Sequence, residues 1–203
     1  MRTPTKRSDT DSIPLSVRSI RDEYFDRIIG HREVLTPENA SRHFIGEGSF
    51  LGEQPEILEF PNRAVLIGTF SSYKSVLSAS GRAIYTEAAI RVLEKFEDVS
   101  GASQPGVDIT IALAGGTVSG SEAGTISYLT QPRSFFVQPG KTYLFVLGYH
   151  AVGDFYMVGK DWDLSDGTAR ANSSLDLRRQ GAGTSILIGL TRAQLVQSLN
   201  KRF

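Results

Sequence analysis

The chain has 203 residues, 40% of them hydrophobic and 22% charged, so it is long and apolar enough to bury a core of its own. Its 22 lysines and arginines balance 22 aspartates and glutamates, and this balance gives no overall field that attracts nucleic acid or an anionic membrane. The absence of cysteine excludes disulfides, thiol catalysis and cysteine-ligated metals. No run approaches the ~20 apolar residues that a membrane-spanning helix needs.

The N-terminal part predicts a tail, a helix and an arm. Residues 1–14 are polar and charged, which is typical of a disordered tail, and they lack the apolar segment of a secretory signal. We therefore expect a cytoplasmic protein, or an extracytoplasmic one if the chain is a mature or truncated form. Over 16–29 apolar residues recur at helical spacing, which predicts an amphipathic helix ended by Gly30. The Gly- and Pro-rich residues 31–62 predict an irregular connecting arm.

From residue 63 onward the sequence predicts a mainly β domain that extends to residue 203, preceded by the helix and arm of residues 15–62. Short alternating or apolar runs are separated by Gly- and Pro-containing turns, which is typical of strands joined at hairpin spacing. The expected strands are 64–70, 106–113, 125–130, 141–149, 155–158 and 162–164, and the expected turns are 78–82, 115–116, 138–140 and 166–167.

The segment YTEAAIRVLEKF at 85–96 fits two structures. Its composition favours a helix, whereas its alternation places small and apolar residues on one face and charged residues on the other, as in a strand. Because the neighbouring segments on both sides are predicted strands, we favour a strand here, with the helix as the alternative.

The C-terminal segment carries the signature of a helix start. Thr191 is a candidate N-cap, Gln194 follows three residues later, and Leu190 can pack against Leu195. A capping box combined with a hydrophobic staple predicts a helix over 192–199.

Four segments carry a resemblance: VLIGT at 65–69, YTE at 85–87, VLEK at 92–95 and GKTYLFVL at 140–147. They resemble a pattern in uncharacterised, mostly secreted bacterial β-barrel proteins, and their layout is similar to that of netrin-like domains, the OB-type barrel of tissue inhibitors of metalloproteinases. The resemblance covers about half the chain and implies a small closed barrel of five or six strands with flanking helices. Netrin-like inhibitors chelate a protease zinc through an N-terminal cysteine, which this chain lacks, so no inhibitory residue carries over.

A calcium site is a weak candidate in DWDLSDG at 161–167. Asp161, Asp163 and Ser165 match the first three ligand positions of a calcium loop, but Asp166 stands where such a loop needs glycine, and Asn172 where it needs glutamate. A hairpin turn at 166–167 explains the segment better.

The remaining motifs for chemistry are incomplete, so no cofactor is expected. His31, His43 and His150 form none of the paired spacings of zinc ligands. The glycines of GEGSFLG at 46–52 lack the lysine of a phosphate-binding loop, and no GxSxG elbow occurs. Glu94, Glu97 and Asp98, close to Lys95, indicate a solvated strand end.

The leading hypothesis is therefore a non-catalytic module that binds or scaffolds a protein or a small ligand through loops at the barrel rim. We expect these loops at 115–124 and 150–154. The candidate contact residues are Gly115, Gly116, Tyr149, His150 and Asp154.

Two alternatives stay open. One is a hydrolase with scattered catalytic residues, which a cleft holding a group of strongly shifted pKa would favour. The other is a single-stranded nucleic-acid-binding barrel with aromatic platforms. The candidate aromatic residues are Phe70, Tyr73, Tyr143, Phe145 and Tyr149. Because cations are not interleaved with them, and Tyr143 and Phe145 share a face with Leu147, a core role is favoured and a nucleic-acid partner is disfavoured.

Overall fold

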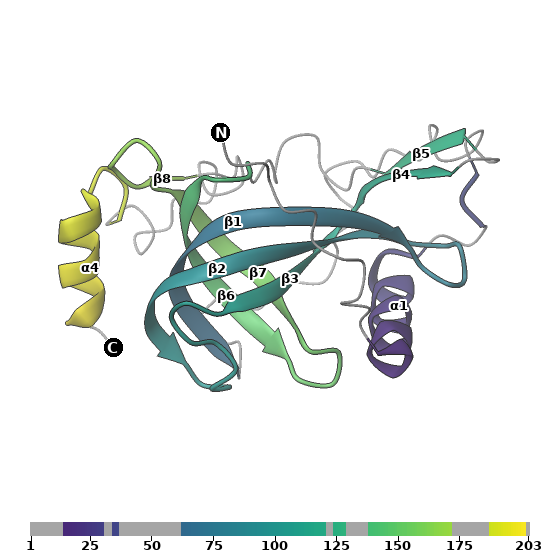
Figure 1. Cartoon of the computed structure of the whole chain (residues 1–203), viewed down its shortest axis with the longest axis horizontal. Helices are drawn as coiled ribbons and strands as arrows, with labels where there is room; N and C mark the ends of the chain where they lie inside the picture. Colours follow the sequence, from purple (N-terminus) through teal and green to yellow (C-terminus); the bar gives the residue numbers. More distant parts are fainter. Residues whose placement is uncertain are drawn as a thin grey trace, which may run out of the picture.

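The computed structural model describes residues 14–30, 34–36, 62–120, 124–128, 138–171 and 187–201 (Figure 1). Its elements are α1 (Leu15–Ile29), β1 (Arg63–Leu77), β2 (Ile84–Asp98), β3 (Asp108–Ala114), β4 (Gly116–Gly120), β5 (Gly124–Tyr128), β6 (Thr142–His150), β7 (Phe155–Asp163), β8 (Arg170–Ala171) and α4 (Arg192–Asn200). The predicted tail, except for Pro14, and most of the predicted arm lie outside the described residues.

The fold is mainly β, and five of its strands form a ring. The six-stranded sheet has the order β3-β2-β1-β6-β7-β8, and β3 also pairs with β7, which joins the two sides. The closing pair is parallel, with Ile111 opposite Tyr156, whereas the neighbouring pairs within the sheet are antiparallel. The division of the chain into an N-terminal unit and a β domain stays a prediction.

Strand β1 bends around the ring. It pairs with β2 along its length and with β6 over Arg63–Thr69. Its register with β2 shifts at three places, and extra residues of this kind bend a strand and increase its twist. Gly68 lies at one shift, where a Cβ atom would come within 2.3 Å of the Ile90 side chain. The absence of a side chain here therefore lets β1 and β2 approach closely.

The inside of the ring is an apolar core built by alternate residues of its five strands. Tyr143, Phe145 and Leu147 share the inner face of β6, as predicted, and their exposed fractions are 1%, 0% and 0%. The other buried members of this core are Ala64, Leu66, Phe70, Ala88, Ile90, Val92, Ile109, Ile111 and Tyr156.

The two helices cover different parts of the outside of the ring. In Figure 1 α4 lies to the left of the strands and α1 to the right. From α4, Leu195 and Leu199 pack in one cluster with Trp162 of β7. From α1, Phe25 packs in a separate cluster with Tyr85 of β2. Each fully buried leucine or phenylalanine contributes roughly 1.5–3 kcal/mol of transfer free energy.

The structure confirms the main predicted elements. The ambiguous segment at 85–96 is a strand within β2, and both helices begin or end within one residue of the expected positions. The Thr191 hydroxyl accepts from the Gln194 amide, and the Gln194 side chain accepts from the Thr191 amide, so the capping box is present.

Two element predictions are wrong. The expected short strands at 155–158 and 162–164 are one continuous β7, because a register shift in its ladder with β6 accommodates the intervening residues. The Ser- and Gly-rich segment expected as a loop after residue 115 forms β4, which pairs with β5. Backbone hydrogen bonds pair the two strands, and Val118 of β4 packs against the cluster that contains Phe25 and Tyr85.

Candidate functional site

A polar seam joins α1 to the outer face of β2. The Tyr85 hydroxyl donates to Asp22 Oδ1 at 2.7 Å, and the other oxygen of Asp22 accepts from the Ala79 amide at 3.1 Å. The Phe25 ring stacks on Tyr85 with 4.3 Å between ring centroids. Burial raises the pKa of Tyr85 well above its ordinary value, and the hydrogen bond to Asp22 raises it further. The phenol therefore keeps its proton and stays a donor. The seam fixes α1 in position and orientation.

Arg21 extends this seam from α1 to the β6–β7 connection. Its side chain is nearly fully buried, with 3% exposure. Its Nε donates to the Gly153 carbonyl at 2.7 Å, one terminal nitrogen donates to Glu87 at 2.9 Å, and the other donates to the Asp154 carbonyl. Because a buried guanidinium is tolerated only when it is paired and hydrogen-bonded, these partners hold both Arg21 and the loop.

The loop at 151–154 is shaped by its own residues as well. The Gly153 amide donates to His150 Nδ1 at 3.1 Å, and a Cβ atom on Gly153 would come within 2.6 Å of the Phe155 ring. Asp154 has a φ of 47°, which is uncommon for a residue with a side chain, and its carboxylate accepts from the Tyr149 hydroxyl at 2.8 Å. Burial, together with the bond to Asp154, raises the pKa of Tyr149 to about 12.

The β2–β3 connection at 99–107 is anchored by Asp98. Its carboxylate accepts from the Ser100 hydroxyl at 2.6 Å and from the Ser103 amide and hydroxyl at 2.6 and 2.7 Å. Burial raises the pKa of Asp98, but the hydrogen bonds from Ser100 and Ser103 outweigh it and hold the pKa below its ordinary value. The carboxylate is therefore an ionised anchor whose oxygens are occupied by the loop.

Two tyrosines connect these loops. The Tyr156 hydroxyl lies 3.3 Å from Asp98 Oδ2, and its ring lies 4.8 Å from that of Tyr149, which bonds to Asp154. We call the loops at 99–107 and 151–154 the rim. They lie at the lower end of the ring in Figure 1. The rim exposes three valines: Val99 at 60%, Val107 at 47% and Val152 at 68%.

The structure places the five candidate contact residues in two groups. Tyr149, His150 and Asp154 lie together at the rim, and the His150 ring stacks on Phe155 at 4.9 Å. Gly115 and Gly116 lie elsewhere. The Gly115 amide donates to the carbonyl of Ile84, and Gly116 packs against the Ser75 and Thr86 side chains. Sequence reasoning missed Arg21 and Asp98, because charges on a helix or at a strand end are normally solvated.

The calcium candidates do not converge as a calcium loop would require. Asp161 is buried, with 2% exposure, whereas Asp163 pairs with Lys141 at 3.3 Å and accepts from the Ser165 amide at 2.8 Å. Asp163 thus organises the turn before Gly167, which has a φ of 80°. Within the described ranges, no group of three or more histidines, aspartates and glutamates could hold a metal ion.

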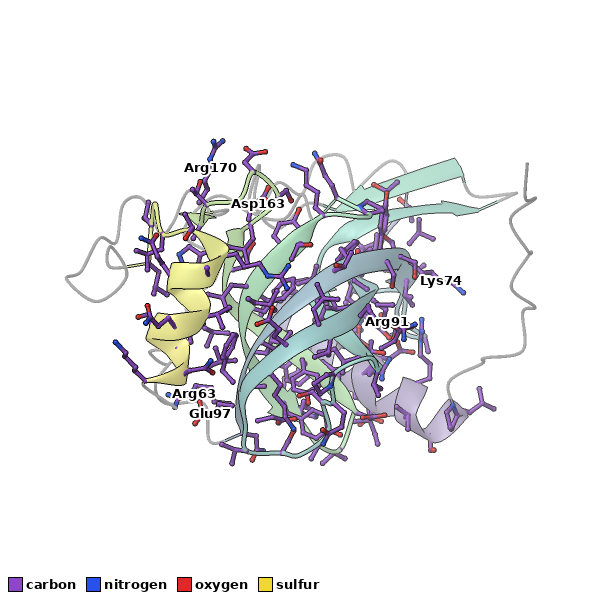
Figure 2. All side chains as sticks on the ribbon, turned by 60° about the vertical axis from the view of Figure 1, so that its left-hand side comes forward. Arg63, Lys74, Arg91, Glu97, Asp163 and Arg170 are labelled. Atoms are coloured by element: carbon purple, nitrogen blue, oxygen red, sulfur yellow. The ribbon has the colours of Figure 1, made fainter. Side chains whose placement is uncertain are left out.

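The other predicted acidic residues form ion pairs at the surface. Figure 2 shows Arg63 and Glu97 side by side, and their closest atoms are 2.6 Å apart. Glu94 pairs with Arg192 of α4 and lines a shallow hollow of about 690 Å³ between β2 and α4. In this hollow Glu94 already has a cationic partner, which is the arrangement of a structural ion pair.

The aromatic platform expected of a nucleic-acid-binding protein is mostly internal. Phe70, Tyr143 and Phe145 are at most 2% exposed, whereas Tyr73 is 60% exposed. Of the histidines, His150 is described, while His31, His43 and the glycines at 46–52 lie outside the described residues.

Comparisons with protein-family models, curated proteins and solved structures found no match. Among the helices that the structure describes, none has the length and apolar character needed to cross a membrane.

Proposed function

We propose that this chain is a non-catalytic binding module whose contact surface is the rim. The observation that carries the proposal is the loop at 151–154. Its backbone is held by the buried Arg21 and by His150, while Val152 at its tip is 68% exposed. A rigid loop loses little conformational entropy when it binds, so an exposed apolar side chain on such a loop suits recognition.

The proposed partner is a protein. Val99, Val107 and Val152 offer exposed apolar side chains on loops that polar groups hold, and a protein interface likewise combines apolar and polar contacts. A small ligand is usually bound in a concave pocket, whereas these valines are exposed on loops.

We also propose that the ring is a small closed barrel of the OB or netrin-like type. The support is the strand order: β1, β2 and β3 form a meander, and the β6–β7 hairpin then closes the ring on both sides. A five-stranded OB barrel has a Greek-key arrangement of this kind.

Nucleic-acid binding is the less favoured alternative because α1 occupies the relevant surface. OB barrels bind oligonucleotides on the face of their second and third strands, between the loops that follow the first and fourth strands. Here Phe25 of α1 packs against Tyr85 of β2 and Ala112 of β3. The helix also contacts both flanking connections, through Asp22 to Ala79 and through Arg21 to Gly153.

The hydrolase alternative lacks a supporting arrangement at the rim. A general base needs a carboxylate that can reach a substrate proton. Asp98 accepts bonds from Ser100, Ser103 and Tyr156, and Asp154 accepts one from Tyr149. These carboxylates hold loops and side chains in place.

The proposed function is tested by substituting Val152→Asp in the full chain. Immobilised wild-type protein and the variant are used to capture partners from the same lysate, with Tyr73→Ser as a matched control because Tyr73 is 60% exposed on β1, outside the rim. We expect Val152→Asp to reduce capture of a specific partner about tenfold or more, as loss of a central contact does, while the control retains it.

Equal capture by wild type and Val152→Asp would contradict the rim as the contact surface. A thermal-unfolding screen with zinc, calcium, a mixed oligonucleotide and metabolites separates the alternatives. A ligand at about 100 times its Kd adds roughly 2.7 kcal/mol, so a rise of the midpoint by a few degrees with the oligonucleotide would favour nucleic-acid binding instead.

A further inference from the structure

His150 lies where the rim, the ring and α1 meet. Its ring stacks on Phe155 of β7 at 4.9 Å and meets the edge of Tyr24 of α1 at 4.9 Å. Its Nδ1 accepts the amide hydrogen of Gly153 at 3.1 Å. This last bond requires Nδ1 to carry no proton, because a protonated imidazole has only donors. The observed loop is therefore the form that belongs to neutral His150.

We propose that His150 is a pH-sensitive switch: when its Nδ1 takes a proton from solvent, the bond from the Gly153 amide is lost and the loop at 151–154 is released from α1. Two donors then face each other across the former 3.1 Å contact, so the loop backbone has to move. The same loop residue is bound by Arg21 through its carbonyl, so the movement reaches α1 directly.

The charges around His150 favour the neutral ring. From α1, Arg27 lies over the Tyr24 ring at 5.8 Å and Arg21 lies over the Phe155 ring at 5.7 Å. From the loop, Asp154 is the nearby carboxylate, and it is engaged by the Tyr149 hydroxyl. An imidazolium at this place would thus stand close to the Arg27 guanidinium, between aromatic rings that already carry cation–π contacts.

The pKa of His150 is shifted in the direction that favours the neutral ring seen in the structure. Burial lowers the pKa of His150 below its ordinary value of 6.5, and the positive charge of Arg27 lowers it further. A backbone hydrogen bond acts in the opposite direction but does not outweigh them. A histidine whose pKa is lowered by folding contributes full stability above about pH 6.5, and this contribution is lost as the pH falls through the folded pKa. Acidification therefore weakens the contact between the loop and α1.

The loop release itself stands on the geometry of His150, whereas its effect on partner binding rests on the proposed function. Because Val152 lies in the released loop, protonation would spread the rim over more conformations and lower its affinity. The rim would then bind its partner at neutral pH and release it at mildly acidic pH.

The test follows two signals of the full chain by NMR from pH 8 to pH 4.5: the His150 ring and the Gly153 amide. We expect both to titrate with one midpoint below 6.5, and the Gly153 amide to lose its exchange protection about tenfold one pH unit below that midpoint. The variant His150→Asn keeps a side-chain oxygen acceptor that does not titrate, so its Gly153 signal should not change with pH.

Three results would overturn the switch: a Gly153 amide that does not follow the His150 titration, a His150 that stays neutral down to pH 4.5, or an unchanged Gly153 titration in His150→Asn. Fluorescence of Trp162, which packs in the cluster beside α4, should stay constant over the same range. A simultaneous change there would show global unfolding and would also overturn a local switch.

The binding consequence is measured separately at pH 7.5 and at one unit below the midpoint. Partner capture that depends on Val152 but not on pH would overturn the regulation and leave the proposed function standing. The opposite result is also informative. If His150 titrates as expected but Val152→Asp does not change partner capture, the proposed function is overturned and the switch stands.

Discussion

The helices α1 and α4 both cover the outside of one ring, yet they are attached by different forces. At α4 the buried contact is apolar, because Leu195 and Leu199 pack in a cluster with Trp162, and the ion pair of Arg192 with Glu94 lies in solvent. At α1 an apolar contact is combined with buried charges, because Arg21 and Asp22 are 2% and 7% exposed and bond to the ring.

The apolar contact of α4 and the buried polar contacts of α1 serve different purposes. Apolar burial is non-directional and depends little on pH, so α4 is suited to closing one side of the core. Buried hydrogen bonds and charges are directional and costly when one partner is lost, so α1 holds particular backbone atoms in fixed positions. The atoms that it holds belong to the loop at 151–154, which is part of the rim.

The largest expected effect comes from breaking the α1 seam with Arg21→Met. This change leaves Glu87, whose side chain is 11% exposed, and the carbonyls of Gly153 and Asp154 without their main donor. We expect the free energy of unfolding to fall by about 3–5 kcal/mol, as when one member of a buried ion pair is removed. Urea unfolding followed by Trp162 fluorescence measures it.

The control is the double variant Arg21→Met with Glu87→Leu. In Arg21→Met the Glu87 carboxylate keeps only the longer contact with Arg18, at 3.4 Å. Removing this carboxylate as well leaves no poorly paired buried charge, so the double variant should be more stable than Arg21→Met alone. A loss below about 1 kcal/mol for Arg21→Met would mean that the seam contributes no more than a surface ion pair.

The second-largest loss of stability is expected from Leu195→Ala, in the apolar contact of α4. Leu195 is fully buried, so the substitution removes apolar burial and leaves a cavity, which costs about 2–5 kcal/mol. Unlike the α1 variants, this one should leave the Gly153 amide signal unchanged. Gln197→Ala, at an exposed position of the same helix, is the matched control and should have little effect. A shift of the Gly153 signal in Leu195→Ala would show that the two attachments are coupled.

The smallest effect is expected at the start of α4, with Thr191→Ala. This change removes the side-chain oxygen that accepts from the Gln194 amide at 3.3 Å. Loss of an N-cap costs typically about 1 kcal/mol, which denaturant unfolding can resolve, and Thr191→Ser should restore most of it. Equal stability of the alanine and serine variants would show that the cap hydrogen bond adds nothing measurable once Leu195 is packed.

Much of the element pattern could be predicted because its signals are local. The alternation within β2 identified a strand although its composition favoured a helix, since packing inside the ring outweighs intrinsic propensity. The continuity of β7 and the existence of β4 could not be predicted, because both depend on pairing with another strand. Of the candidate contact residues, Tyr149, His150 and Asp154 lie close in sequence, and their proximity in space follows from one hairpin.

The sequence by itself determined the turns at 78–82, 138–140 and 166–167, the cap of α4 and the inner face of β6, because each depends on residues within a few positions of one another. The turn expected at 115–116 is not formed, since β4 begins at Gly116. The tertiary structure decided the closure of the ring and the role of α1. Ile111 meets Tyr156 only when the ring closes, and Arg21 reaches a carbonyl 132 residues away. An arginine on an amphipathic helix is normally solvated. Arg21 can be buried because the fold places the carbonyl acceptors of the β6–β7 loop next to it.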